Sequence, residues 1–218
     1  MTPFFRLDGI RFAYDRGRPV LDGASFQLAS GDKVALTGPN GAGKTTLFHL
    51  MVGLLKPSAG TLEAFGLPRR SEKDFTEVRA RAGILFQDSD DQLFCPTVAE
   101  DVAFGPLNLG KRPAEARAIV TETLSMLGLD GFEDRITHKL SGGQKRLVAL
   151  ATVLAMRPDV LLLDEPTNAL DEVTEARLTD ILLGLPQAMV IISHDNAFLD
   201  RIATRRVRLH QGRLAEEG

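Results

Sequence analysis

A glycine-rich loop at residues 38–45, Gly-Pro-Asn-Gly-Ala-Gly-Lys-Thr, dictates much of how this chain can fold. The loop matches the pattern G-x-x-x-x-G-K-[ST], which by average composition arises by chance in roughly one chain per hundred. The apolar run at residues 34–36 predicts a strand before the loop. A helix ending at Lys56-Pro57 is predicted after it, because apolar side chains recur at helical spacing at Leu47, Leu50, Met51 and Leu54. Strand, loop and helix in this order predict an α/β fold with an anion site at the loop.

The chemistry of such a loop favours phosphate. Glycines let the backbone curl so that several N–H groups point at one phosphate cluster, and the helix N-terminus adds partial positive charge. Lys44 can reach the β- and γ-phosphates of a nucleotide, and the Thr45 hydroxyl can hold Mg²⁺. The alternative is a flexible glycine turn before a helix, and the strand–loop–helix context argues against it.

Other short apolar runs predict the rest of a sheet. Residues 84–86, 160–163 and 189–192 have strand length and are almost entirely apolar. Helical patterns separate these runs, which favours a parallel sheet covered on both faces. The first thirty residues also look like strands, because Ala24, Phe26 and Leu28 alternate with polar neighbours.

The stretch from about residue 88 to 156 reads mostly as helix. Thr97 with Glu100 and Ser141 with Gln144 form two capping boxes, each of which predicts a helix N-terminus. Because these helices interrupt the strand pattern, they predict a lobe of their own within the domain.

Length and composition fit a single domain. The 218 residues, 44% hydrophobic and 25% charged, are ordinary for one globular unit. We expect residues 1–218 to form one domain, with 1–87 and 157–218 as its catalytic core lobe and 88–156 as its helical lobe. The net charge of −3 gives no general reason to expect nucleic acid as a partner. No apolar run approaches the roughly 20 residues that cross a bilayer, so we expect any membrane role to depend on a partner.

Two carboxylates follow the apolar run at residues 160–163. Asp164 and Glu165 stand at its carboxyl end, which is where ligands bind in open α/β sheets. Asp164 is suited to Mg²⁺, directly or through water, and Glu165 is suited to orient or deprotonate an attacking water. The alternative is a solvated strand end before a turn at Pro166, which the nearby phosphate loop makes less attractive.

The segment Leu140-Ser141-Gly142-Gly143-Gln144 predicts a second anion site. Two glycines at a capped helix N-terminus expose free N–H groups and a partial positive charge. A simple nucleotide-binding domain needs only one such site. An ordinary capped helix with permissive glycines is the alternative.

At this point the chain resembles the ATP-binding-cassette (ABC) ATPases, and the resemblance covers nearly the whole sequence. Residues 38–45 look like the family's Walker A loop, 161–165 like Walker B and 140–144 like its signature motif. The other markers fall in the family's order, with Tyr14 as the adenine-stacking aromatic, Gln87 as the Q-loop glutamine, 169–171 as the D-loop and His194 as the switch histidine. The resemblance implies the P-loop NTPase fold in its ABC form: a mostly parallel core sheet, an N-terminal antiparallel β part and an inserted helical subdomain.

The family's arrangement implies a role for each of these residues. Two domains stack head to tail, and each ATP lies between the phosphate loop of one and the signature helix of the other. The resemblance therefore implies an ATPase that uses ATP and Mg²⁺ and pairs with a second ATPase subunit, expected to be an identical copy. Nucleotide contacts are assigned to Tyr14, Asn40, Gly41, Gly43, Lys44, Thr45 and Thr46, and contacts to the partner's nucleotide to Ser141, Gly142, Gly143 and Gln144. Mg²⁺ is assigned to Thr45, Gln87 and Asp164, and catalysis to Glu165 as base with Gln87 and His194 at the γ-phosphate.

One branch of the family is particularly similar. Residues 86–94, 97–106 and 147–156 look like the energy-coupling-factor importers, specifically their cobalt and nickel ATPase components. The resemblance implies membrane-embedded partners that bind the substrate, and a location at the cytoplasmic face of the cell membrane. Vitamin importers, such as those for biotin, use similar ATPases and stay an alternative. The acidic cluster Asp88, Asp90 and Asp91 is interpreted as part of the partner-facing surface rather than as a metal site.

Non-transport ABC ATPases are the rivals from other classes. Chromosome-maintenance and DNA-repair members separate the motifs with long coiled coils, whereas the segment between Lys44 and Leu140 is short and has no sustained heptads. Ribosome-associated factors usually carry two cassettes in one chain, and this chain has a single set of motifs. A plain nucleotide-binding regulator would not need the complete signature segment.

Overall fold

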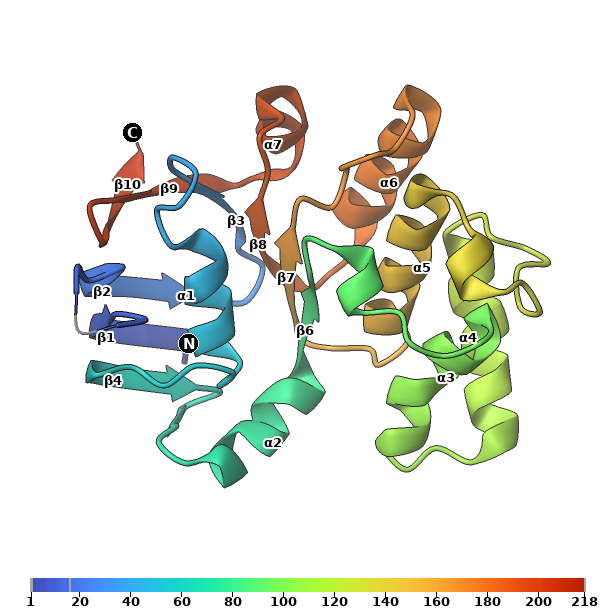
Figure 1. Cartoon of the computed structure of the whole chain (residues 1–218), viewed down its shortest axis with the longest axis horizontal. Helices are drawn as coiled ribbons and strands as arrows, with labels where there is room; N and C mark the ends of the chain where they lie inside the picture. Colours follow the sequence, from blue (N-terminus) through green and yellow to red (C-terminus); the bar gives the residue numbers. More distant parts are fainter. Residues whose placement is uncertain (1, 16, 218) are drawn as a thin grey trace.

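Two β-sheets organise the residues that the computed structural model describes, 2–15 and 17–217 (Figure 1). The larger sheet has the strand order β10-β9-β3-β8-β7-β6. Its members are β3 (Lys33–Thr37), β6 (Ala82–Leu85), β7 (Val160–Asp164), β8 (Ala188–Ile192), β9 (Arg205–His210) and β10 (Arg213–Glu217). All neighbours pair in parallel except β10, which pairs antiparallel with β9 at one edge. β7 and β8 are buried along their whole length, which explains their unbroken apolar sequences.

The smaller sheet is antiparallel and comes mainly from the N-terminal segment. Its order is β2-β1-β4-β5, formed by β1 (Phe5–Phe12), β2 (Leu21–Leu28), β4 (Ala59–Ala64) and β5 (Leu67–Pro68). The alternation predicted in β2 is confirmed, because Ala24, Phe26 and Leu28 are all buried. The expected antiparallel part and the mostly parallel core sheet are therefore both present.

Helix α1 (Lys44–Met51) shares one apolar cluster with strands of both sheets and lies between them in Figure 1. The predicted end of this helix at Lys56-Pro57 is wrong, because α1 ends at Met51 and Leu54 lies beyond it, 52% exposed. Gly53 has a φ of +74°, and the N–H of Leu54 donates to the His49 carbonyl at 2.8 Å. This is the glycine closure that commonly ends helices, and it acts before the proline is reached.

Three helices gather on the far side of the parallel sheet from the antiparallel sheet: α3 (Val98–Asn108), α4 (Pro113–Met126) and α5 (Gly142–Leu154) (Figure 1). Both predicted capping boxes are present, at the start of α3 and at the start of α5. Helix α5 also covers the sheet, because its apolar side chains share a cluster with those of β7 and β8. The helical segment is thus joined to the core through α5, and the predicted division into two lobes stays an interpretation.

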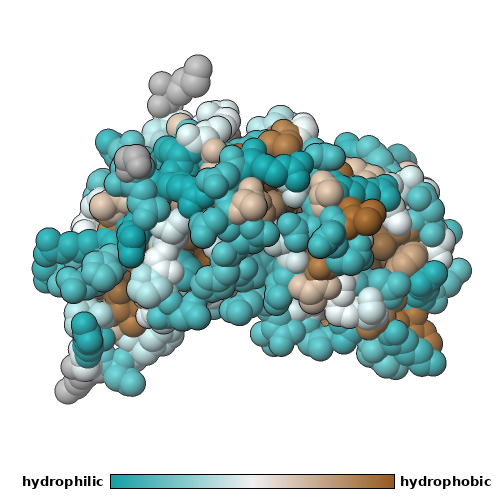
Figure 2. All heavy atoms as spheres, turned by 90° about the horizontal axis from the view of Figure 1, so that it is seen from above, coloured by the Kyte–Doolittle hydropathy of each residue, from teal (hydrophilic) through white to brown (hydrophobic). Residues whose placement is uncertain are grey.

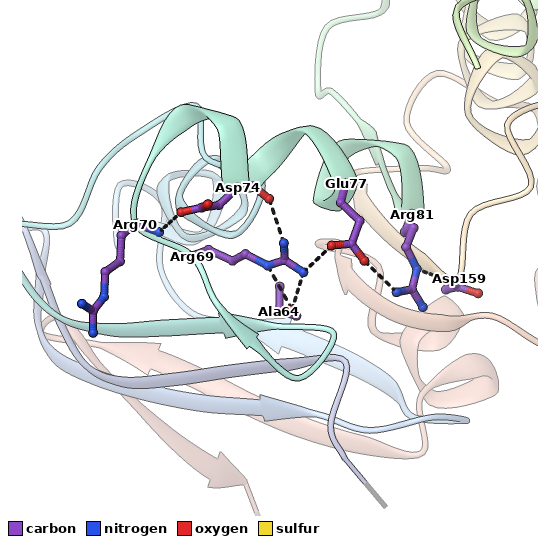
Figure 3. A network of polar contacts seen from close by, with 7 residues as sticks. All are labelled: Ala64, Arg69, Arg70, Asp74, Glu77, Arg81 and Asp159. Carbon is purple, nitrogen blue, oxygen red and sulfur yellow. Dashed lines mark hydrogen bonds and ion pairs between the residues drawn. The ribbon is translucent and has the colours of Figure 1, made fainter. Parts of the chain in front are cut away.

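The remaining α-helices are α2 (Glu72–Arg81), α6 (Glu172–Gly184) and α7 (Asn196–Ile202). A chain of polar contacts links α2 to the end of β4 and to the residue just before β7 (Figure 3). Arg69, directly after β5, is buried and donates to the Ala64 carbonyl and to Glu77 of α2. Arg81 then donates to the carboxylate of Glu77 at 3.2 Å. It also donates to the carboxylate of Asp159, just before β7, at 2.7 Å. This network sets the position of α2, which runs directly into β6.

The outer surface is mostly hydrophilic. In Figure 2 the molecule shows two masses with an indentation between them on one side, and hydrophobic atoms are exposed in small separate areas. Among the described residues, no helix combines the length and the apolar character needed to cross a membrane.

Candidate nucleotide site

The phosphate loop connects β3 to α1 and requires glycine at defined positions. Gly38 has a φ of +136°, and a Cβ there would lie 2.3 Å from the Leu209 carbonyl oxygen. Gly43 has a φ of +104°, and a Cβ there would lie 2.6 Å from a methyl group of Val20. Both the backbone conformation and the close packing exclude a side chain, so these glycines fix the shape of the loop.

Lys44 is the first residue of α1 and lies across the loop. Its Nζ donates to the carbonyls of Gly38 at 2.8 Å and Pro39 at 3.2 Å. Burial lowers the pKa of Lys44, and the carboxylates of Asp164 and Glu165 oppose this shift. An ammonium held among carbonyls at the mouth of a glycine loop is well placed to exchange those carbonyls for phosphate oxygens.

The structure brings Thr45 and Asp164 together. The Thr45 hydroxyl donates to Oδ2 of Asp164 at 2.6 Å, although the two residues come from α1 and from the end of β7. Asp164 is only 3% exposed, and burial raises its pKa, while the hydrogen bond from Thr45 opposes that shift. A hydroxyl and a carboxylate oxygen are hard donors, the kind that Mg²⁺ prefers together with water and phosphate oxygens.

Mg²⁺ would need further ligands from outside the protein. Among the described residues, no group of three or more His, Cys, Asp or Glu side chains could hold a metal ion by itself. A Mg²⁺ ion that is carried in with nucleotide phosphates keeps only one or two protein ligands. The pair Thr45–Asp164 therefore fits Mg²⁺ as part of a nucleotide complex.

Glu165 adopts an unusual backbone conformation directly after β7. Its φ is +51°, in the left-handed region, and its N–H donates to the Ile192 carbonyl at 2.8 Å. Its carboxylate accepts from the N–H of His194 at 3.3 Å, and the imidazole Nε2 lies 3.7 Å from Oε1. Oε1 is buried and has no hydrogen-bond partner among the described residues. Strain and an unsatisfied carboxylate oxygen at one residue are features that cluster at active sites.

Gln87 borders the same hollow as Thr45. A hollow of about 630 Å³ is bordered by Thr45, Gln87, Gly142 and Ala169, among others. Residues from four places therefore border this hollow: the phosphate loop, the segment after β6, the start of α5 and the segment after β7. The predicted residues Thr45, Gln87 and Gly142 meet here, although they are far apart in the sequence.

Tyr14 lies against the first turn of α1, next to the loop. Its hydroxyl is 3.0 Å from the Thr46 hydroxyl, and its ring packs edge-on against Phe12 with the centroids 5.0 Å apart. The side chain is 62% exposed, so a large part of the ring is open to contact. Asn40, at the tip of the loop, is exposed as well.

The predicted second anion site is the N-terminus of α5. The Ser141 Oγ accepts from the Gln144 N–H at 3.3 Å, and the Gln144 side chain accepts from the Ser141 N–H at 3.1 Å. Ser141 and Gly142 are exposed, whereas Gly143 packs so closely that a Cβ would lie 2.9 Å from the Ala169 carbonyl oxygen. The side chain of Gln144 is thus engaged in capping, which leaves the exposed face of the helix start to Ser141 and Gly142.

A sequence model of the ABC transporter family matches residues 21–168, more than half of the chain. The chain belongs to the ABC transporter family. This ABC domain is 46% identical over 222 residues to the cobalt import ATP-binding protein CbiO of Rhodobacter capsulatus, covering 100% of this chain and 79% of that protein. It is 44% identical over 216 residues to the energy-coupling factor transporter ATP-binding protein EcfA of Methanothermobacter thermautotrophicus, covering 97% of this chain and 70% of that protein.

Solved structures agree with the family and the fold of the ABC domain. The structure of cbiO1 from Clostridium perfringens, part of the transporter complex cbiONQ, matches with a TM-score of 0.87 and 34% identity over 99% of this chain and 88% of that chain. An ATP-binding cassette solved as a dimer in a post-hydrolysis state, bound to ADP and Pi, matches with a TM-score of 0.90 and 26% identity over 98% and 97%. The ABC domain is therefore an ATP-binding, ATP-hydrolysing subunit of a transporter, related to the energy-coupling-factor type.

Sequence reasoning missed one residue of the ABC domain that reaches this site. Arg146, in the second turn of α5, is 3% exposed and donates hydrogen bonds to the carbonyls of Asp164 and Glu165. The available signal was a single arginine at the start of an otherwise apolar run, residues 147–151. Charged side chains are rarely buried without specific partners. An arginine that begins an apolar run is therefore a candidate for a structural role.

Proposed function

We propose that the ABC domain works as a dimer of identical copies, in which the phosphate loop of one copy and the Ser141 end of α5 of the other enclose each ATP. One observation carries the proposal: the start of α5 presents Ser141 and Gly142 at an exposed helix N-terminus. Within the described part of the chain, no hydrogen bond joins residues 141–144 to the phosphate loop. A positively polarised helix end of this kind suits an anion that comes from elsewhere, and the γ-phosphate held by a second copy meets that requirement.

The proposal assigns the adenine end and the phosphate tail to one copy. Tyr14 offers an exposed ring for stacking, and its hydroxyl lies next to that of Thr46 in the first turn of α1. The backbone of the loop at Asn40, Gly41 and Gly43 would surround the phosphates, and Lys44 would neutralise their charge. Thr45 and Asp164 would hold Mg²⁺, which supplies charge neutralisation at the β- and γ-phosphates.

Hydrolysis is assigned to the cluster around Glu165. The Glu165 carboxylate is held in place by the His194 N–H and would take the proton of the attacking water or orient it. Gln87 borders the hollow beside Thr45 and would contact Mg²⁺ or that water. The His194 imidazole, close to Oε1 of Glu165, would donate to the γ-phosphate. Ser141, Gly142 and Gly143 would approach the same phosphate from the second copy, with Gln144 keeping the helix start capped.

The dimer proposal is tested with Glu165→Gln, which should bind ATP and lose turnover. Without turnover, bound ATP should keep the two copies associated, so sedimentation should show a dimer in the presence of ATP and Mg²⁺. The double variant Lys44→Ala with Glu165→Gln is the control and should stay monomeric, because its phosphate loop binds ATP weakly. A Glu165→Gln protein that is saturated with ATP and Mg²⁺ and still sediments as a monomer would refute the proposal.

A membrane-embedded subunit is the proposed second partner, and its docking place is an apolar groove near Gln87. The groove, about 240 Å³, is lined by Phe86, Phe94 and Phe104, among others. Phe94 is 66% and Phe104 is 47% exposed, and their rings meet edge to face with the centroids 4.8 Å apart. An exposed aromatic pair suits an apolar segment of a partner. Since Phe86 precedes Gln87, an occupant would contact the backbone that carries this residue. Docking there would hold the ABC domain at the cytoplasmic face of the membrane.

Cobalt is the proposed substrate of the assembled importer. The support is the similarity to the cobalt import ATP-binding protein of Rhodobacter capsulatus. The proposal gives the ion-binding site to the membrane partner; among the described residues, no group of three or more His, Cys, Asp or Glu side chains could hold a metal ion. Uptake of labelled cobalt by cells that carry the chain and the neighbouring reading frames should depend on an intact Glu165. Uptake of nickel or biotin instead of cobalt would replace this assignment.

A further inference from the structure

A buried arginine of α5, Arg146, joins this helix to the segments that follow β6 and β7. These two segments carry Gln87 and Glu165. Nη2 of Arg146 donates to the carbonyl of Asp164 and, at 2.8 Å, to that of Glu165. Nη1 donates to the carbonyl of Phe86 and, at 3.3 Å, to that of Gln87. One guanidinium on α5 therefore binds the ends of two neighbouring parallel strands, β6 and β7.

The environment of Arg146 shows that the backbone carbonyls hold it. The side chain is buried, and no carboxylate of the described residues forms an ion pair with it within 4.0 Å. Its charge is balanced by carbonyl dipoles and by more distant carboxylates, including Asp164 and Glu165. Burial lowers the pKa of Arg146 to about 10, so the guanidinium is still charged at neutral pH. Because an arginine carries a planar fork of donors, it can bridge two pairs of carbonyls in a way that lysine cannot.

The contacts fall on backbone that needs external support. Glu165 has a left-handed φ of +51°, and it is held on one side by the Ile192 carbonyl and on the other by Arg146. Phe86 is likewise held on both sides, because its N–H donates to the Gln92 side chain at 3.1 Å while its carbonyl accepts from Arg146. Gln92 in turn donates to the Ala149 carbonyl of α5 at 3.1 Å. Helix α5 thus fixes the backbone that carries both Gln87 and Glu165.

We propose that Arg146 is a positioning residue for ATP hydrolysis, which sets the backbone of Gln87 and Glu165 relative to the helix that begins at Ser141. The inference rests on the proposed roles of Gln87 and Glu165. It does not involve the phosphate loop, because Arg146 makes no hydrogen bond to residues 38–45 in the described chain. Loss of the guanidinium therefore slows the chemical step and leaves ATP binding largely intact.

The test compares Arg146→Gln and Arg146→Lys with the wild type, with measurements of ATP affinity, kcat and KM. Arg146→Gln should lower kcat by about 10- to 100-fold, since a displacement of about 1 Å of a catalytic group can cost 100-fold. Arg146→Lys should give an intermediate kcat, because it keeps the charge and part of the donor set. ATP affinity should stay within about 3-fold in both variants, which marks a loss confined to the transition state. Arg117→Gln, an exposed arginine in the middle of α4, is the matched control and should leave kcat unchanged.

The outcomes separate this inference from the proposed function. If Glu165→Gln abolishes turnover while a folded Arg146→Gln or Arg146→Lys keeps kcat within 2-fold of the wild type, the positioning role is wrong and the function stands. If Glu165→Gln itself keeps full turnover, the proposed base is wrong. Loss of ATP binding in proportion to kcat would also overturn the inference, because it would indicate a general structural role. Should Arg146→Gln fail to fold, Arg146→Lys alone decides, through a lower kcat at unchanged ATP affinity.

Discussion

The left-handed backbone at Glu165 gives a sharp stability prediction. At most positions a substitution to glycine destabilises the folded state more than one to alanine. At a φ of +51° the alanine substitution is the more destabilising of the two. A non-glycine residue in the left-handed region costs about 1–2 kcal/mol, and the greater chain entropy of unfolded glycine offsets about 0.5–1 kcal/mol of that. We therefore expect Glu165→Gly to have a higher free energy of unfolding than Glu165→Ala, by about 0.5–1 kcal/mol.

Urea unfolding without nucleotide measures this difference, and the matched control is Glu122. Glu122 is exposed within α4, where helical geometry makes alanine better than glycine by about 1 kcal/mol. Glycine should thus be the more stable substitution at position 165, and alanine the more stable one at position 122. Both variants at 165 should lack turnover, because both remove the proposed base. If alanine is the more stable residue at both positions, the backbone of Glu165 is not strained and the reasoning fails.

Three further predictions concern the loop and Asp164. Lys44→Ala should weaken ATP binding by at least about 10-fold, as measured by nucleotide titration, because an ammonium–phosphate contact is lost. Gly38→Ala should destabilise the fold by about 2 kcal/mol or more, since its Cβ would lie 2.3 Å from the Leu209 carbonyl oxygen; an unchanged urea midpoint would contradict the loop geometry. Burial raises the pKa of Asp164, so the folded state binds the proton more tightly than the unfolded state. The free energy of unfolding should therefore fall as the pH rises from the unfolded to the folded pKa of Asp164. Asp164→Asn should flatten this part of the pH–stability curve, measured without nucleotide or metal.

The elements with local sequence signals could be predicted, and the site follows from them in outline. The phosphate loop, the buried strands β7 and β8, and the capping boxes of α3 and α5 each depend on residues within one short segment. The meeting of Thr45 with Asp164 follows from general rules, because the carboxyl ends of parallel strands share one edge of the sheet. The placement of β8 between β3 and β7 has no comparable signal.

Features that depend on long-range packing could not be read from the sequence. Helix α2 buries only Phe75 and Val78, so its apolar pattern is too weak to reveal it, and the contacts of Arg69 and Arg81 in Figure 3 hold it instead. Arg146 binds backbone carbonyls, which every residue type carries, so no motif marks its partners. The early end of α1 depends on Gly53 and its neighbours rather than on the more visible proline.

Complementation between two inactive variants tests the shared site most directly. Lys44→Ala disables the phosphate loop, and Ser141→Arg blocks the start of α5 with a bulky side chain. Each variant alone should be inactive, but a mixed dimer would contain one site with neither change. Mixing should restore turnover, to about a quarter of the wild-type rate if the chains pair at random. A mixture that stays as inactive as its components would show that each ATP is hydrolysed within one chain, contrary to this account.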